Sequence, residues 1–243
     1  MLALGLHLEA QLLPALERLA ESGATLWTAG DWLEPEDLIA TTEAGGSHDP
    51  HVWMDLELWA AITGAMGQRL RETLPESAAQ IESRERELLA DLQQADAWAA
   101  RAFQSIPARG RVLVTSHDAF GYLGRRYGIE VHGLQGLSTE SEAGLARVEA
   151  LVDLLVERQV PALFGESTIS SEGLRALLEG AAARGHNVAL GGELFSDATG
   201  PVGSGADSVL GMFEHNVRTI VLGLGGVPGE RDSSETQTAG GTR

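Results

Sequence analysis

The sequence predicts an α/β protein, and three of its features support this fold class. Short apolar segments alternate with helical segments along much of the chain, which is typical of a mostly parallel sheet covered by helices. One helical pattern, over residues 75–106, is far longer than the others. The 243 residues are 43% hydrophobic and 21% charged, a composition and length that suit one large or two small globular domains.

The first 74 residues are expected to fold as strand, helix, strand, loop and helix. These segments are residues 2–6, 9–21, 25–29, 33–49 and 55–73. The helix over 9–21 carries Leu12, Leu16 and Leu19 on one face. The segment 33–49 contains Pro, Gly, Thr and Ser, so it is predicted to be mostly loop.

Residues 75–106 form the longest periodic pattern in the chain. Apolar residues such as Leu92, Trp98 and Phe103 recur at helical spacing, and residues 82–87 supply charge on the other face. A continuous helix of this length spans roughly 45 to 50 Å at 1.5 Å per residue. That is long for a helix inside one small domain, and it suits a rigid connection between two lobes.

The chain after this helix alternates between short strands and helices. Strands are predicted at residues 111–115, 129–134, 161–165 and 188–190, and helices at 118–127, 143–158, 171–184 and 206–224. The expected organisation is an N-terminal lobe (1–74), a bridging helix (75–106), a C-terminal α/β lobe (107–227) and a tail (228–243). The tail is rich in Gly, Ser and Thr with almost no apolar residues, so we expect it to be disordered.

Charge and cysteine content exclude several classes of function. The formal net charge of −18 disfavours binding to nucleic acids and to anionic lipid surfaces. The absence of cysteine excludes disulfides and thiolate metal sites, which leaves imidazole and carboxylate side chains for a metal. No apolar run is long enough for a transmembrane helix, and the N-terminal MLALGLHLEA lacks the pattern of a secretion signal.

Histidines supply the most informative candidates for a functional site. His51 and His48 lie in HDPHVWMD, where Pro50 restricts the turn before His51 and Trp53 follows as an apolar anchor. An HxxH pair alone is a weak signal, because many such pairs lie in exposed loops. His117 follows the strand RVLVTS, at the end of the strand where ligands bind in parallel sheets, although it could also cap the next helix.

Three acidic residues lie in comparable positions. Asp197, in the Gly-rich GGELFSDATG after a strand, can reach a cation or act as a turn or N-cap residue. Glu193 in the same loop is a competing candidate. Glu166, at the end of the strand PALFG, could orient a ligand imidazole or cap the following helix.

Other patterns give weaker signals. The remaining histidines fall on a strand, a helix or a turn between elements, where structural roles are common, at positions His7, His132, His186 and His215. GLGGVPG is not followed by a helix, so it does not fit a nucleotide-binding loop. The sequence contains no GxSxG, P-loop lysine or HExxH motif.

Several motifs together resemble the zinc/manganese receptors (solute-binding proteins) of ABC importers. They are HDPHVWMD, RVLVTSHDAFGYLGRRYGIEV, LQGLSTESEAG, PALFGES and GGELFSDATG, in the order and spacing of that family. The resemblance covers about residues 2–223. It implies two α/β lobes joined by one long rigid helix, with a metal ion held between the lobes. It also implies His51, His117 and Asp197 as metal ligands.

The resemblance has one departure, which lies at the N-terminus. The fourth ligand of the family is a histidine in an HxYE-like motif that precedes the segment matching LALGL, so we expect the N-terminal lobe to be incomplete here. His7 matches a different family position and does not replace it. The chain could be a truncated form of a complete receptor or a shortened protein with a three-ligand site, and the intact motifs favour truncation.

The expected function is capture of Mn²⁺ or Zn²⁺, with Fe²⁺ also possible, and delivery of the ion to an ABC permease without catalysis. Nitrogen and oxygen ligands suit all three ions, and the lack of a His-rich loop slightly favours manganese. The resemblance further implies a monomeric protein outside the cytoplasm, periplasmic or lipid-anchored at the cell surface. Two alternatives stay open: a zinc-dependent hydrolase, or a surface adhesion or regulatory protein that keeps the receptor fold.

Overall fold

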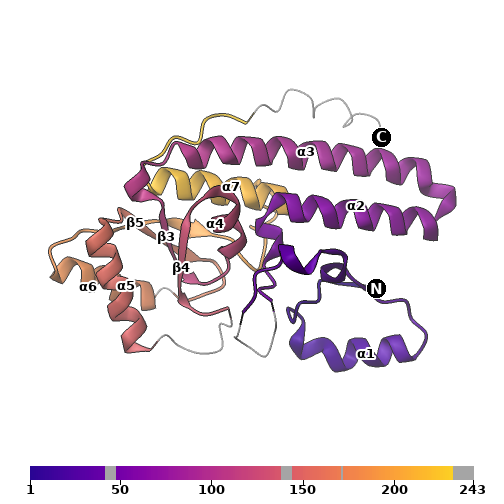
Figure 1. Cartoon of the computed structure of the whole chain (residues 1–243), viewed down its shortest axis with the longest axis horizontal. Coiled ribbons are helices and arrows are strands. Elements are labelled where there is room, and N and C mark those ends of the chain that lie inside the picture. The colour runs from indigo at the N-terminus through magenta and orange to yellow at the C-terminus, as the bar shows by residue number, and fades with distance from the viewer. Residues whose placement is uncertain (42–47, 138–143, 171, 232–243) are drawn as a thin grey trace. The chain divides into compact units, whose positions relative to one another are not determined.

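The computed structural model describes residues 1–41, 48–137, 144–170 and 172–231 (Figure 1). The chain divides into two compact units, Met1–Gln93 and Gln94–Arg243. Each unit is considered by itself below. The domain bounds predicted from the sequence stay a prediction.

In its described residues, the first unit contains a short parallel strand pair, two complete α-helices and the first part of a third. Strand β1 (Leu2–Ala3) pairs with β2 (Trp27–Thr28), and the complete helices are α1 (Leu13–Glu21) and α2 (Leu56–Thr73). Both strands are shorter than predicted. Gly5, Leu6 and His7 all have positive φ, between +52° and +79°, so the backbone leaves the extended conformation before the predicted end of the first strand.

The core of the first unit surrounds the start of α2. Val52, Met54, Leu56 and Ile62 are buried there. The helix begins at the N-cap Asp55, whose side chain accepts a hydrogen bond from the Glu57 amide at 3.0 Å. The preceding residues form a 3₁₀ turn, so the short segment after the HDPH motif is buried and held in place.

The predicted loop over 33–49 contains a single 3₁₀ turn, Pro35–Asp37, in its described part. An isolated antiparallel bridge joins Ala40 to His48. The bridge brings the two ends of the segment together just before the Asp49–Pro50–His51 turn. Residues 42–47 of the predicted loop lie outside the described residues.

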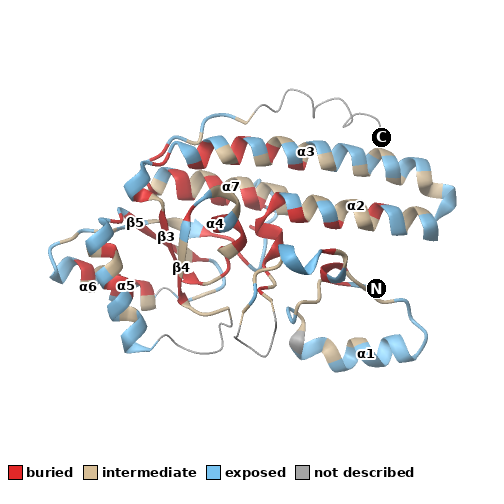
Figure 2. Cartoon of the chain, viewed as in Figure 1, coloured by how far each residue is buried: buried red, intermediate tan, exposed pale blue. Residues whose placement is uncertain are grey.

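The predicted long helix is present as α3 (Ala78–Gln104), preceded by a 3₁₀ turn at Pro75–Ser77. The division between the two units falls within this helix. Its burial is uneven, because Leu88 is 40% exposed whereas Trp98 and Phe103 are each 1% exposed (Figure 2). The predicted apolar face is therefore buried mainly in the second half of the helix.

The second unit is built on four parallel-paired strands. Strand β3 (Val112–His117) pairs with β4 (Glu130–Gln135), and β5 (Ala162–Glu166) pairs with β6 (Ala189–Leu194). Strands β3 and β5 also lie against each other. The predicted parallel arrangement is confirmed for the described strands. The ends of β3 and β5, where His117 and Glu166 lie, consequently come together.

Among the described residues, three helices connect these strands and a fourth follows the last of them. They are α4 (Gly121–Tyr127), α5 (Leu145–Arg158), α6 (Glu172–Ala183) and α7 (Val209–Gly223). Helices α5 and α6 pack on each other, and α7 packs on β6 and β5. The buried faces of strands and helices meet in one core, which includes the stacked rings of Phe103 and Tyr127 (Figure 2).

The part of the predicted tail nearest the second unit makes defined contacts. The Gly229 carbonyl accepts hydrogen bonds from Trp98 Nε1 at 3.4 Å and from Arg218 Nη1 at 3.2 Å, and Arg231 pairs with Glu214. Residues 229 and 231, which fall within the predicted tail, therefore contact the second unit. Residues 232–243 of the tail lie outside the described residues. Among the described helices, none combines the length and apolar character of a membrane span.

Candidate metal centre

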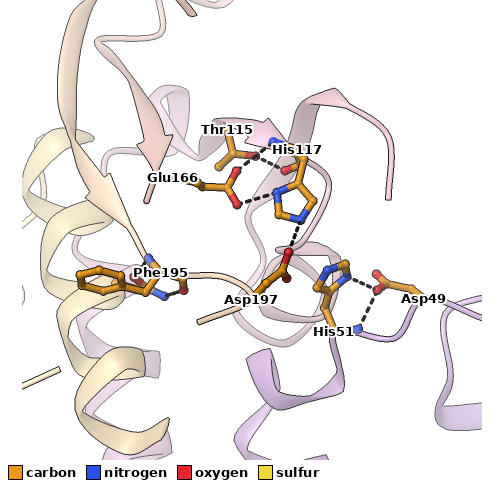
Figure 3. Close-up of polar contacts among 8 residues, drawn as sticks. Asp49, His51, Thr115, His117, Glu166, Phe195 and Asp197 are labelled. Atoms are coloured by element: carbon orange, nitrogen blue, oxygen red, sulfur yellow. Dashed lines mark hydrogen bonds and ion pairs between the residues drawn. The ribbon is translucent and has the colours of Figure 1, made fainter. Parts of the chain in front are cut away.

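His117 is the last residue of β3 and is fully buried. A single carboxylate holds it at two points: Glu166 Oε1 accepts a hydrogen bond from the His117 amide at 2.8 Å, and Oε2 lies 2.6 Å from the ring Nδ1 (Figure 3). An ionised carboxylate only accepts hydrogen bonds, so this contact places the ring proton on Nδ1. The lone pair of a neutral imidazole is then on Nε2, where it can bind a metal.

Asp197 lies on the Nε2 side of the same ring. Its Oδ2 atom is 3.5 Å from His117 Nε2, and its side chain is 35% exposed. Two ligand atoms about 2.1 Å from one ion in a tetrahedral arrangement are about 3.4 Å apart. The observed separation therefore matches that of two ligands to a common ion. Two of the three predicted ligands are brought together within the second unit (Figure 3).

His51, in the first unit, is held in a similar way by a residue close to it in the chain. Asp49 Oδ1 accepts a hydrogen bond from the His51 amide at 2.9 Å and lies 2.7 Å from its Nδ1 (Figure 3). The ring of His51 makes an edge contact with Trp53, with centroids 5.2 Å apart. His51 is only 2% exposed. Its Nε2 atom is the ring nitrogen on the side away from this carboxylate, as in His117.

Asp49 is a residue whose role was missed from the sequence. Its spacing of two residues before His51 was the available signal, because a carboxylate there can fold back onto the histidine amide and ring. Glu166 was predicted either to orient a ligand imidazole or to cap the following helix. Its carboxylate contacts the His117 ring, which is the contact that the first role requires. Glu193 is exposed, and its carbonyl accepts a hydrogen bond from His215 Nε2 at 3.0 Å.

Three other histidines, His132, His186 and His215, contact residues other than the predicted ligands. His186 Nε2 is 2.8 Å from the Val160 carbonyl, and His132 Nε2 is 2.9 Å from Glu130 Oε1. The hydrogen bond from His132 holds the pKa of Glu130 below its ordinary value; burial acts against this, and Arg158 adds to the lowering. His7 is exposed and has a positive φ.

Comparison with known proteins identifies the class to which this fold and centre belong. A family model described as "Zinc-uptake complex component A periplasmic" matches residues 1–223. The chain belongs to this family of metal-binding, solute-binding proteins of ABC importers. The resemblance seen in the sequence motifs is thereby confirmed, as is the predicted fold class.

Particular relatives are similar over most of the chain. The manganese-binding lipoprotein MntA of Bacillus subtilis is 40% identical over 220 residues, which are 90% of this chain and 71% of the relative. The zinc-binding protein TroA of Treponema pallidum is likewise 40% identical, over 90% of this chain and 70% of its own length.

Solved structures of metal-binding proteins are also similar to this chain. The structure of periplasmic zinc-binding TroA from Treponema pallidum superposes with a TM-score of 0.86 at 40% identity, covering 92% of this chain and 79% of that one. Fe(III)-bound YtgA from Chlamydia trachomatis has a TM-score of 0.83 at 28% identity, covering 94% of this chain and 81% of that one. By their names, these relatives bind manganese, zinc or iron.

Proposed function

We propose that this protein captures a divalent metal ion through His51, His117 and Asp197 and delivers it to an ABC permease. Membership of the metal-receptor family supports this function. The proposed ion is Mn²⁺ or Zn²⁺, the ions in the names of the relatives that are 40% identical. Fe²⁺ is a further candidate, because an imidazole and carboxylate ligand set also accepts it.

The observation that carries the proposal is the arrangement around His117. A buried imidazole whose Nδ1 side is occupied by Glu166 presents Nε2 towards Asp197, at 3.5 Å. Two electron-rich atoms facing each other at this distance are stabilised by a cation between them. The carboxylate of Glu166 would fix the ring orientation and raise the basicity of the ligand nitrogen.

His51 would supply the ligand from the first unit. Its Nδ1 atom contacts Asp49 as Nδ1 of His117 contacts Glu166, so Nε2 would be the ligand atom in both rings. The sequence motif DPHVW, on which the family resemblance partly rests, contains it. The ion is cargo in this proposal, so the site has to hold and release it without making or breaking a covalent bond. Location outside the cytoplasm, as in the periplasmic and lipoprotein relatives, belongs to the same proposal.

Isothermal titration calorimetry of the full chain with Mn²⁺ and with Zn²⁺ tests the proposal. We expect one ion per chain. Losing a residue that only orients a metal ligand typically weakens metal binding about 10- to 100-fold. We expect His117→Ala and Asp197→Ala, which each remove a ligand, to weaken binding by more than this. His132→Ala is the matched control, because His132 also lies beside a carboxylate but away from the centre. Unchanged binding in both site variants would contradict the proposal, and metal-dependent turnover of a test ester would favour a hydrolase.

A further inference from the structure

Asn216 is a polar residue that is fully buried in α7. Its side-chain amide makes two hydrogen bonds to the backbone of one residue, Phe195. Oδ1 accepts from the Phe195 amide at 2.9 Å, and Nδ2 donates to the Phe195 carbonyl at 2.7 Å. The amide therefore satisfies both backbone groups of Phe195, as a neighbouring strand would.

Phe195 follows the end of β6 and lies two residues before Asp197 (Figure 3). The residue between them, Ser196, is 2% exposed. Next to Asn216 on α7, His215 places its ring against Phe195, with centroids 4.9 Å apart, and its Nε2 lies 3.0 Å from the Glu193 carbonyl. Helix α7 thus contacts the backbone at two points just before the proposed ligand.

The strand upstream of these contacts contains two consecutive glycines. Gly191 and Gly192 lie within β6, and Gly192 has a φ of +139°, which side-chain-bearing residues rarely adopt. Glycines at these positions leave the end of the strand with more conformational freedom than other residues would. The hydrogen bonds from α7 restrain Phe195, just after the point where the pairing of β6 with β5 ends.

We propose that Asn216 is a positioning residue for Asp197, one that fixes the approach of its carboxylate to His117 Nε2. The inference rests on the proposed function, since it assigns Asn216 to the same metal centre. Its chemical reason is that a buried backbone amide and carbonyl need partners, so Phe195 stays where Asn216 can satisfy both. The position of Asp197, two residues on, follows from that of Phe195.

The test is a double-mutant cycle measured by Mn²⁺ and Zn²⁺ titration of the full chain, with Asn216→Ala, Asp197→Ala and the double variant. We expect Asn216→Ala to weaken binding of either ion about tenfold. This is the low end of the range measured when a residue that orients a metal ligand is removed. In the Asp197→Ala background, we expect Asn216→Ala to cause no further loss, because the ligand that it positions is gone. A merely structural role would give the same loss in both backgrounds.

Val221→Ala is the matched control, because Val221 is also fully buried in α7 but lies outside the contacts to Phe195. It should lower the thermal midpoint while leaving metal affinity unchanged. If Asn216→Ala does not fold, His215→Ala, which removes the contact to Glu193 from a half-buried position, should weaken binding less but show the same dependence on Asp197. Additive losses in the cycle would overturn the inference. Unchanged affinity in Asp197→Ala itself would instead overturn the proposed function.

Discussion

The two histidine–carboxylate pairs of this protein make the same contacts by different means. In each pair, one carboxylate meets both the backbone amide and the Nδ1 atom of a buried histidine. Asp49 uses a single oxygen for both contacts and lies two residues from His51. Glu166 uses one oxygen for each contact and lies 49 residues from His117.

The two pairs therefore depend on different levels of structure. A local turn is enough to form the first pair, whereas the second forms only when distant segments of the chain pack together. The Asp49–His51 pair needs only the Asp–Pro–His turn, with Pro50 limiting the backbone. The Glu166–His117 pair exists because β3 and β5 lie against each other and end together. Loss of Glu166 should therefore affect both folding and metal binding, whereas loss of Asp49 should affect mainly metal binding.

The largest effect is expected for Glu166→Ala. Removing this carboxylate leaves the buried His117 amide and Nδ1–H without their acceptor, and each unsatisfied buried group costs about 1–3 kcal/mol. We expect a free energy of unfolding lower by about 2–6 kcal/mol from two such groups, together with an about 10- to 100-fold weaker metal affinity. Urea denaturation of the metal-free protein and calorimetry measure the two quantities. If the free energy of unfolding of Glu166→Ala equals that of the wild type, the Glu166–His117 pair does not contribute to folding more than the Asp49–His51 pair does.

Asp49→Ala should give a smaller effect on stability. The pair is local, so the turn can relax when the carboxylate is lost, and we expect a cost of about 1 kcal/mol for the lost hydrogen bonds. Metal affinity should still fall about 10-fold, because His51 loses the group that orients its ring. The same two measurements apply, and Asp49→Asn serves as the control that keeps an acceptor for the amide. A stability loss equal to that of Glu166→Ala would show that both pairs depend on the fold to the same degree.

What the sequence could predict follows the same division between local and long-range features. The alternation of strands and helices, the long helix and the positions of His51, His117 and Asp197 in their motifs were all visible in the sequence. The Asp49 contact was also within reach, since it depends on a spacing of two residues. For Glu166, orientation of a ligand imidazole could only be offered as one of two roles, because the packing of β3 against β5 brings together segments that are distant in the sequence.

The contacts of α7 with the end of β6 could not be predicted from the sequence. Asn216 and Phe195 are 21 residues apart, and nothing in the sequence around either residue indicates a double hydrogen bond. The early end of the first strand was missed for another reason. Leu6 adopts a positive φ, which leucine rarely does, so propensity alone predicted a longer strand.

A third carboxylate, Asp96, supplies a comparison outside the proposed site and is expected to give the smallest effect. Burial acts to raise the pKa of Asp96, but hydrogen bonds from Arg126 and Tyr127 and the charge of Arg126 outweigh it, so its pKa lies below the ordinary value of 3.8. Because the folded-state pKa is lowered, the ionised group stabilises the protein above about pH 4, and this contribution is lost as the pH falls through the folded-state pKa.

Asp96→Asn should therefore lower the free energy of unfolding by about 1 kcal/mol at pH 7, as expected for a partly exposed ion pair with additional hydrogen bonds. The difference from wild type should shrink as the pH is lowered below 4, where wild-type Asp96 becomes protonated. Urea denaturation at a series of pH values measures this, with Mn²⁺ and Zn²⁺ titrations at pH 7 as the control. Unlike Asp49→Ala and Glu166→Ala, this variant should leave metal affinity unchanged, because Asp96 pairs with Arg126 and Tyr127 instead of a proposed ligand. A change in affinity would mean that stability and metal binding are coupled through the whole second unit, and that the affinity losses at Glu166 cannot be assigned to His117 alone.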